Sequence, residues 1–124
     1  YEELLKELAE LAGNLLVETL PKFAAGEIKP EPQNEAEAIY TKKFKSEDAF
    51  VDENDLKEAE SGKNQKKAEL IDRKIRALNP EPGVWTLENG KRVKLLEAEI
   101  SENKLVLKKI QIEGEKPRRV ESSM

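Results

Sequence analysis

The sequence predicts an α+β chain, in which an N-terminal amphipathic helix and an extended linker lead into a second helix and a small, OB-like antiparallel β-barrel. Three observations support this class. Apolar residues recur at helical spacing before residue 25 and again before residue 80. After residue 83, three segments mix apolar and polar residues with the period of two that strands show. At 124 residues, the chain is long enough to bury one modest core.

Residues 2–25 are expected to form the first helix. Its leucine-rich stripe is too apolar for an isolated helix in water, so we expect it to pack on a surface that the downstream chain does not provide. Pro21 should kink this helix or start a new turn, and Gly26 is suited to end it. The stripe consists of Leu4, Leu5, Leu8, Leu11, Ala12, Leu15, Leu16, Leu20 and Phe23.

The next segment, residues 27–45, is predicted to be a linker. Pro30 and Pro32 favour an extended, semi-rigid backbone there. Ser46 is expected to cap a short helical turn, because two acidic residues follow it and acidic side chains favour the start of a helix.

A polar segment and a second helix follow. Residues 52–63 are highly charged and contain a Ser61-Gly62 break, so we predict a mobile loop. A helix should then run from about Gln65 to Leu78. Pro80 cannot continue this helix, and Pro82-Gly83 turns the chain. The predicted buried face of the helix consists of Ala68, Ile71, Ile75 and Leu78.

Three strands are predicted after this turn. Asn89-Gly90 should form the loop of the first hairpin, because this pair readily adopts the positive φ angles of a type I′ turn. The alternation of apolar residues changes phase at Leu95-Leu96, and again between Leu107 and Ile110, which predicts a bulge or a strong bend. We expect the strands at about 84–88, 91–100 and 104–112.

The remaining segments are expected to complete a thin barrel. A fourth short strand from residues 39–51 should help to close it, and residues 114–124 should form a flexible tail. Trp85 is the only tryptophan. At the start of a strand, such a residue is more typical of a core anchor than of a surface on which bases stack.

The composition excludes several kinds of site. The chain contains no cysteine and no histidine, which excludes disulfides, the usual zinc sites and histidine-dependent nucleophiles. No pair stands out among the 26 acidic residues, so we predict no catalytic residue and no metal site. No apolar run approaches the length of a membrane span and no signal peptide is recognisable, so we expect a cytoplasmic protein without a membrane partner.

The charge is unevenly distributed. The net charge of -4 argues against a strongly basic nucleic-acid binder. Residues 1–39 hold three lysines and nine glutamates, whereas residues 40–80 hold ten basic and nine acidic residues. Residues 84–124 hold nine basic and seven acidic residues. A local basic patch beyond the first helix could therefore still face phosphates.

Two blocks of the sequence resemble segments of a known family. The run from Arg76 to Pro80, then Pro82-Gly83, an aromatic strand and an Asn-Gly-Lys-Arg hairpin at 89–92, resembles the start of the C-terminal domain of methionyl-tRNA formyltransferases. The chain departs from the family at Glu81, where a Trp is usual, and at residues 54–67, which are longer and more polar. A second block resembles the last catalytic-domain helix and the linker; it comprises Glu18–Phe23, Ala25–Pro30, Pro32-Gln33 and Tyr40–Phe44.

The resemblance implies a division into residues 1–26 from the end of a catalytic domain, a linker at 27–45, a C-terminal domain at 46–113 and a tail at 114–124. It also implies an enzyme that transfers a formyl group from 10-formyltetrahydrofolate to methionine on initiator tRNA, in translation initiation. The catalytic Asn, His and Asp of the family lie in the preceding domain. We therefore expect this chain, which starts at Tyr1 rather than Met, to be a fragment without cofactor or activity of its own, monomeric and packed on the missing domain.

The candidate tRNA-binding residues are basic. Lys42, Lys43 and Lys45 lie beside Tyr40 and Phe44 on the linker, where ammonium groups can follow a phosphate backbone. The alternatives are solvated lysines without a ligand, a scaffold for a related formyltransferase or hydrolase that acts on a small molecule, and a protein-binding module whose affinity would hardly respond to salt. The other candidates are Arg73, Arg76, Lys91, Arg92, Lys94, Lys108 and Lys109.

Overall fold

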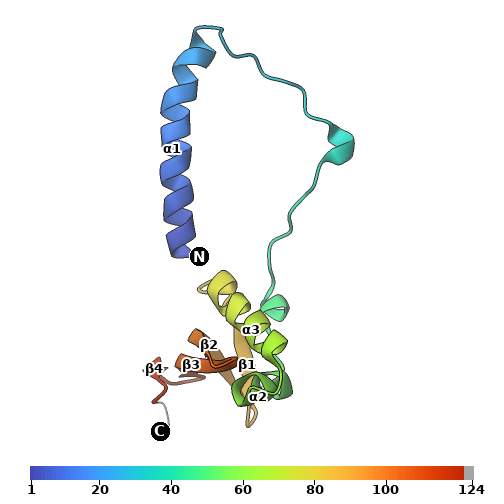
Figure 1. The fold of residues 1–124 in the computed structure, drawn as a ribbon, viewed down its shortest axis with the longest axis vertical. Helices are drawn as coiled ribbons and strands as arrows, with labels where there is room; N and C mark the ends of the chain where they lie inside the picture. Colours follow the sequence, from blue (N-terminus) through green and yellow to red (C-terminus); the bar gives the residue numbers. More distant parts are fainter. Residues whose placement is uncertain (122–124) are drawn as a thin grey trace. The chain divides into compact units, whose positions relative to one another are not determined.

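The computed structural model describes residues 1–121. The chain divides into two compact units, residues 1–42 and the part from Lys43 onward. The first unit contains α1, and the second contains α2, α3 and the strands β1 to β4 (Figure 1).

Helix α1 (Glu2–Ala24) forms where the sequence predicts it, and Pro21 lies within it. It ends at Gly26, which adopts a φ of +75°. The Gly26 N–H donates to the Phe23 carbonyl (3.1 Å) and the Glu27 N–H to the Lys22 carbonyl (3.0 Å), the paired hydrogen bonds of a Schellman motif. None of the residues of α1 is buried.

The segment after α1 has little regular structure. Its one short element is the 3₁₀ turn η1 (Glu35–Glu37), which Asn34 caps by accepting a hydrogen bond from the Ala36 N–H (3.1 Å). The second unit begins with another 3₁₀ turn, η2 (Ser46–Ala49). The prediction that Ser46 caps this turn is wrong. Lys45 occupies the capping position, and its N–H donates to the Asp48 carboxylate (2.7 Å).

Most of residues 52–63 form a helix, so the prediction of a mobile loop there is wrong. Helix α2 (Glu53–Ser61) starts at Asp52, whose Oδ1 accepts from the Asn54 N–H (2.9 Å), and it ends at Gly62 with a φ of +76°. Its contribution to the core is only Leu56 and Ala59. Two apolar residues one turn apart give a weak periodic signal, and this is why the sequence pattern missed the helix.

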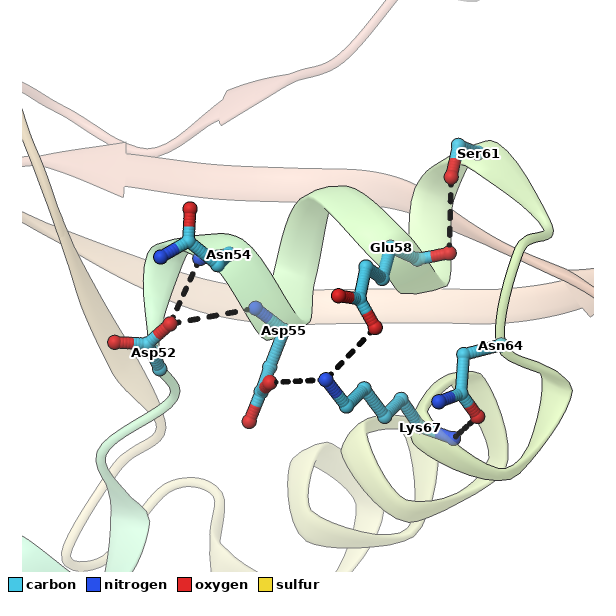
Figure 2. Close-up of polar contacts among 7 residues, drawn as sticks. All are labelled: Asp52, Asn54, Asp55, Glu58, Ser61, Asn64 and Lys67. Atoms are coloured by element: carbon cyan, nitrogen blue, oxygen red, sulfur yellow. Dashed lines mark hydrogen bonds and ion pairs between the residues drawn. The ribbon is translucent and has the colours of Figure 1, made fainter.

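Helix α3 (Gln65–Leu78) follows as predicted, and its buried residues are the four predicted ones. An ion cluster joins it to α2: Lys67 Nζ lies 2.5 Å from Asp55 Oδ1 and 2.7 Å from Glu58 Oε2 (Figure 2). The hydrogen bonds to Asp55 and Glu58 raise the pKa of Lys67. The cluster therefore favours the folded arrangement of the two helices most strongly while the lysine is charged.

The strands form one antiparallel sheet in the order β1-β2-β3-β4. The first hairpin turns at Asn89 and Gly90, with φ angles of +50° and +76°, as a type I′ turn requires. The second turns at Glu102 and Asn103, whose φ angles are also positive. The strands are β1 (Trp85–Glu88), β2 (Lys91–Ser101), β3 (Lys104–Ile112) and β4 (Arg118–Arg119).

The predicted irregularity in β2 and β3 is confirmed. Leu95 pairs with Ile110, and Ala98 pairs with Leu107, but the register shifts on both sides of Glu97. Across this shift, both Leu107 and Ile110 line the same hollow against the inner face of the sheet. The shift thus allows apolar residues from both sides of it to face α2.

The α+β class is confirmed, and the sheet of the described residues is open. No strand forms within residues 39–51, contrary to prediction; there, Phe50 makes only a single bridge with Trp85. The fourth strand is instead β4, which pairs with β3 at Lys109 and Ile110. It lies within the predicted tail, of which residues 122–124 are outside the described residues.

The core lies between the two helices and the sheet, and Asn79 connects them. The Asn79 amide donates to the Leu95 carbonyl (2.8 Å) and accepts from the Val84 N–H (3.1 Å). The Gly83 N–H closes the turn on the Leu78 carbonyl (2.8 Å). The core consists of Ala49, Val51, Leu56, Ala59, Ala68, Ile71, Ile75, Leu78, Val84, Val93, Leu95 and Leu105.

Replacing Asn79 by Ala should lower the free energy of unfolding by about 1–3 kcal/mol, because it leaves a partly buried carbonyl and a backbone N–H without their partner. Urea denaturation followed by circular dichroism would measure the change. Asn54→Ala is the matched control, since no hydrogen bond joins that side chain to another described residue. Equal stabilities of the two variants would contradict the role given to Asn79.

Replacing Lys67 by Met should lower the melting temperature by several degrees, because Asp55 and Glu58 lose their shared cation. Lys66→Met removes an exposed neighbour and should change it little. Since folding raises the pKa of Lys67, its stabilisation is complete below the ordinary lysine pKa and is lost as the pH rises through the folded value. The melting temperatures of the wild-type chain and of Lys67→Met should therefore differ at neutral pH and converge only at strongly alkaline pH.

Candidate nucleic-acid interface

Trp85 joins the end of the linker to the sheet. Its Nε1–H donates to the Ser46 carbonyl (2.9 Å), and its ring centroid lies 4.7 Å from that of Phe50. Its own carbonyl accepts from the Val51 N–H (2.9 Å). The side chain is half-buried and packs against the core, as predicted for an anchor.

Two cations of the β1–β2 hairpin lie on the same face as this indole. Lys94 is directly opposite Trp85 in the antiparallel pairing, and Arg92 is opposite Leu87, two residues further along β1. The Arg92 guanidinium lies over the indole, 3.8 Å from the ring centroid. This cation–π contact holds the guanidinium in one place on an exposed surface.

The linker lysines lie just before Ser46 in the sequence. Lys45 directly precedes Ser46, and Lys43 starts the second unit. Lys42 is the last residue of the first unit. All three side chains are exposed, and within residues 1–121 none of them forms an ion pair. They are therefore free to meet an external anion.

Three of the other predicted cations are paired with carboxylates. Arg76 Nε lies 2.9 Å from Asp72. Lys108 lies 2.5 Å from Glu99, and Lys109 lies 3.3 Å from Glu97. The two lysine pairs join β3 to β2 and depend on the register of the strands, so they could not be predicted from spacing, whereas Arg76 and Asp72 are four residues apart within α3. Arg73 and Lys91 are exposed, on α3 and at the start of β2.

Lys74 has a structural role that was not predicted from the sequence. Its Nζ donates to the Phe50 carbonyl (3.2 Å) and so ties α3 to the end of the linker. The structure thus gathers Lys45, Arg92 and Lys94 around Trp85, and it assigns Lys74 to holding the backbone.

The charge of the second unit is nearly balanced. From Lys43 onward the sequence carries eighteen basic and seventeen acidic residues, against four and nine in residues 1–42. Attraction of an anion to the second unit must therefore come from local grouping of cations and not from net charge.

A hollow between α2 and the sheet carries a net negative charge, which does not suit phosphate binding. It has a volume of about 210 Å³, lies between α2 and the inner face of the sheet, and carries on its lining three carboxylates (Glu53, Glu60 and Glu88) against one ammonium group (Lys57). Partial burial, and then the charge of Glu88, raise the pKa of Glu60. The Thr86 hydroxyl also faces this space, is 2% exposed as a residue, and has no hydrogen-bond partner among the described residues. The excess of carboxylates would repel a polyanion, so the cations around Trp85 are the better candidate for an interface.

The described residues contain neither a metal-binding cluster nor a membrane-spanning helix. No group of three or more acidic side chains is placed to hold a metal ion within residues 1–121. Over the same residues, no helix combines the length and the apolar character that crossing a membrane requires.

Comparison with known proteins gives one domain match and several similar proteins. Residues 63–105 match the family described as "Formyl transferase, C-terminal domain". A methionyl-tRNA formyltransferase of Kosmotoga olearia is 41% identical over 103 residues, which is 83% of this chain and 30% of that protein. One from Corynebacterium aurimucosum is 42% identical over 94 residues, which is 76% of this chain and 25% of that protein.

A third relative, from Lactobacillus delbrueckii subsp. bulgaricus, carries the same name and is 35% identical over 82% of this chain and 29% of its own length. The chain thus spans less than a third of the length of these relatives. The residues that match the domain model contain α3, the turn at Asn79 and the first two strands. Residues 63–105 thus match a formyl transferase C-terminal domain, and most of the chain is similar to methionyl-tRNA formyltransferases.

Proposed function

We propose that this chain is the tRNA-binding C-terminal part of a methionyl-tRNA formyltransferase acting in translation initiation. It holds initiator Met-tRNA by its phosphates, while a catalytic domain outside this chain transfers the formyl group from 10-formyltetrahydrofolate. The observation that carries the proposal is the similarity over 83% of the chain to a protein of that name. The cations gathered around Trp85 support it, because they are placed to meet a polyanion.

The chain contributes to catalysis by positioning. Phosphate contacts fix where a nucleic acid lies and how tightly it binds, but they carry no sequence preference. Holding the tRNA lowers the entropic barrier to bringing its aminoacylated end to the reacting groups. On this proposal the protein works as a cytoplasmic monomer, its chain here holds no cofactor, and the leucine stripe of α1 packs on the catalytic domain.

A second candidate is a protein-binding module, and one observation favours it. Ile39 and Tyr40 are 92% and 83% exposed, beside the linker lysines. Exposed apolar side chains suit a protein partner, whose binding would respond weakly to salt. A tRNA complex instead releases counterions, so its affinity must fall steeply with salt.

The salt dependence of tRNA affinity tests the proposal. For the 124-residue chain, the slope of log affinity against log salt concentration should be about -2 to -5, since a few phosphates are neutralised. Replacing Lys42, Lys43 and Lys45 by Ala should flatten that slope by about 2. Fluorescence anisotropy of labelled tRNA at several salt concentrations would measure both values.

The matched control is a triple Ala variant of Lys63, Lys66 and Lys104, which removes the same charge from exposed lysines of the second unit that make no described contact with Trp85. It should leave the slope nearly unchanged. If both triple variants flatten the slope equally, general attraction explains the binding and the linker has no special role. If tRNA does not bind at low salt, the proposed function is wrong.

In a full-length formyltransferase that carries this chain, the linker triple variant should raise KM for Met-tRNA by about tenfold with a smaller change in kcat, because binding is lost and the reacting groups are intact. Steady-state formylation assays would measure both constants. The 124-residue chain alone should give no formylated product. A lowered kcat at unchanged KM would contradict a role in holding the tRNA.

A further inference from the structure

The linker and the β1–β2 hairpin meet at one side chain. The edge of the Trp85 indole binds the Ser46 carbonyl, and its face carries the Arg92 guanidinium. Lys94 is paired opposite the same residue. The contacts of a single indole therefore connect the backbone that carries Lys45 with the hairpin that carries the other two cations.

The anchored point is close to the linker lysines. Ser46 lies one residue after Lys45 and three after Lys43. Three extended residues span at most about 10 Å. That reach is similar to the Debye length of about 8–10 Å at physiological salt, so the anchored lysines and the hairpin cations act on the same stretch of a polyanion.

The hydrogen bond to Ser46 controls the freedom of the lysines more directly than the other linker contacts do. The Phe50 carbonyl is held by Lys74, and the Val51 N–H by the Trp85 carbonyl, but both lie further along the chain. The bond between Lys45 and Asp48 is local to the 3₁₀ turn. Among the described contacts, the Ser46 carbonyl is therefore the first atom after the linker that is bonded to the sheet.

We propose that Trp85 is a positioning residue whose indole N–H fixes the end of the linker, so that Lys43 and Lys45 bind phosphates as one surface with Arg92 and Lys94. This inference rests on the proposed function, and it names how the tRNA is gripped. When the two sets of cations are held together, binding of one raises the effective concentration of the other. When the linker end is free, each set binds nearly alone.

A double-mutant cycle in the 124-residue chain tests the coupling. Trp85→Phe keeps a ring beneath Arg92 and against Phe50 but removes the N–H donor. In the wild-type background, the double change Lys43→Ala and Lys45→Ala should weaken tRNA binding about tenfold at low salt. In the Trp85→Phe background, the same pair of changes should weaken it by less than about threefold, because the coupling is already lost.

Phe50→Leu is the matched control, since it removes the ring contact with Trp85 and leaves the indole N–H in place. It should retain the full tenfold effect of the lysine changes. An equal effect in the wild-type and Trp85→Phe backgrounds overturns the inference and leaves the proposed function standing. The absence of any tRNA binding by the wild-type chain removes both.

A measurement on the unmodified chain covers the case in which Trp85→Phe does not fold. Trp85 is the only tryptophan, so its fluorescence reports on this position alone. Saturating tRNA should shift its emission and reduce its quenching by acrylamide, and the change should shrink when Lys43 and Lys45 are replaced by Ala. Emission and quenching that do not respond to bound tRNA overturn the inference.

Discussion

The amide of Asn79 is the contact on which the domain depends. Helix α3 ends at Leu78, and the next side chain binds the Leu95 carbonyl of β2 and the Val84 N–H ahead of β1. This fixes the end of the helix against two strands within a few residues. The fixed turn sets the position of Trp85, and through Trp85 it sets the position of the linker end and of Arg92.

The basic surface around Trp85 arises from the positions of a few cations and not from the net charge of the second unit. With eighteen basic and seventeen acidic residues from Lys43 onward, the second unit has almost no net charge. Lys67, Lys108 and Lys109 are occupied by carboxylates, and Lys74 by a backbone carbonyl. What remains around Trp85 is a small group of exposed cations, including Lys45 and Lys94. A local group of this kind suits recognition of a phosphate backbone more than long-range attraction.

Local rules made most of the second unit predictable. The helical period gave the buried face of α3, and Asn89-Gly90 gave the first hairpin, because these signals lie within a few residues of one another. Helix α2 was not predicted, because it has only two buried residues and therefore a weak periodic pattern. The contact between Trp85 and Ser46 joins residues 39 apart, and the pair of Lys109 with Glu97 depends on a shifted register. Neither can be inferred from spacing in the sequence.

The two hairpins also differ in how they are assembled. The turn between β1 and β2 uses Asn89 and Gly90, which accept positive φ angles readily, whereas the turn between β2 and β3 places Glu102, a residue that rarely adopts a positive φ, ahead of Asn103. The first hairpin can therefore close on local preference, beside the end of α3. The second must wait for the burial of Leu105, so the folding nucleus is expected around α3, β1 and the near half of β2.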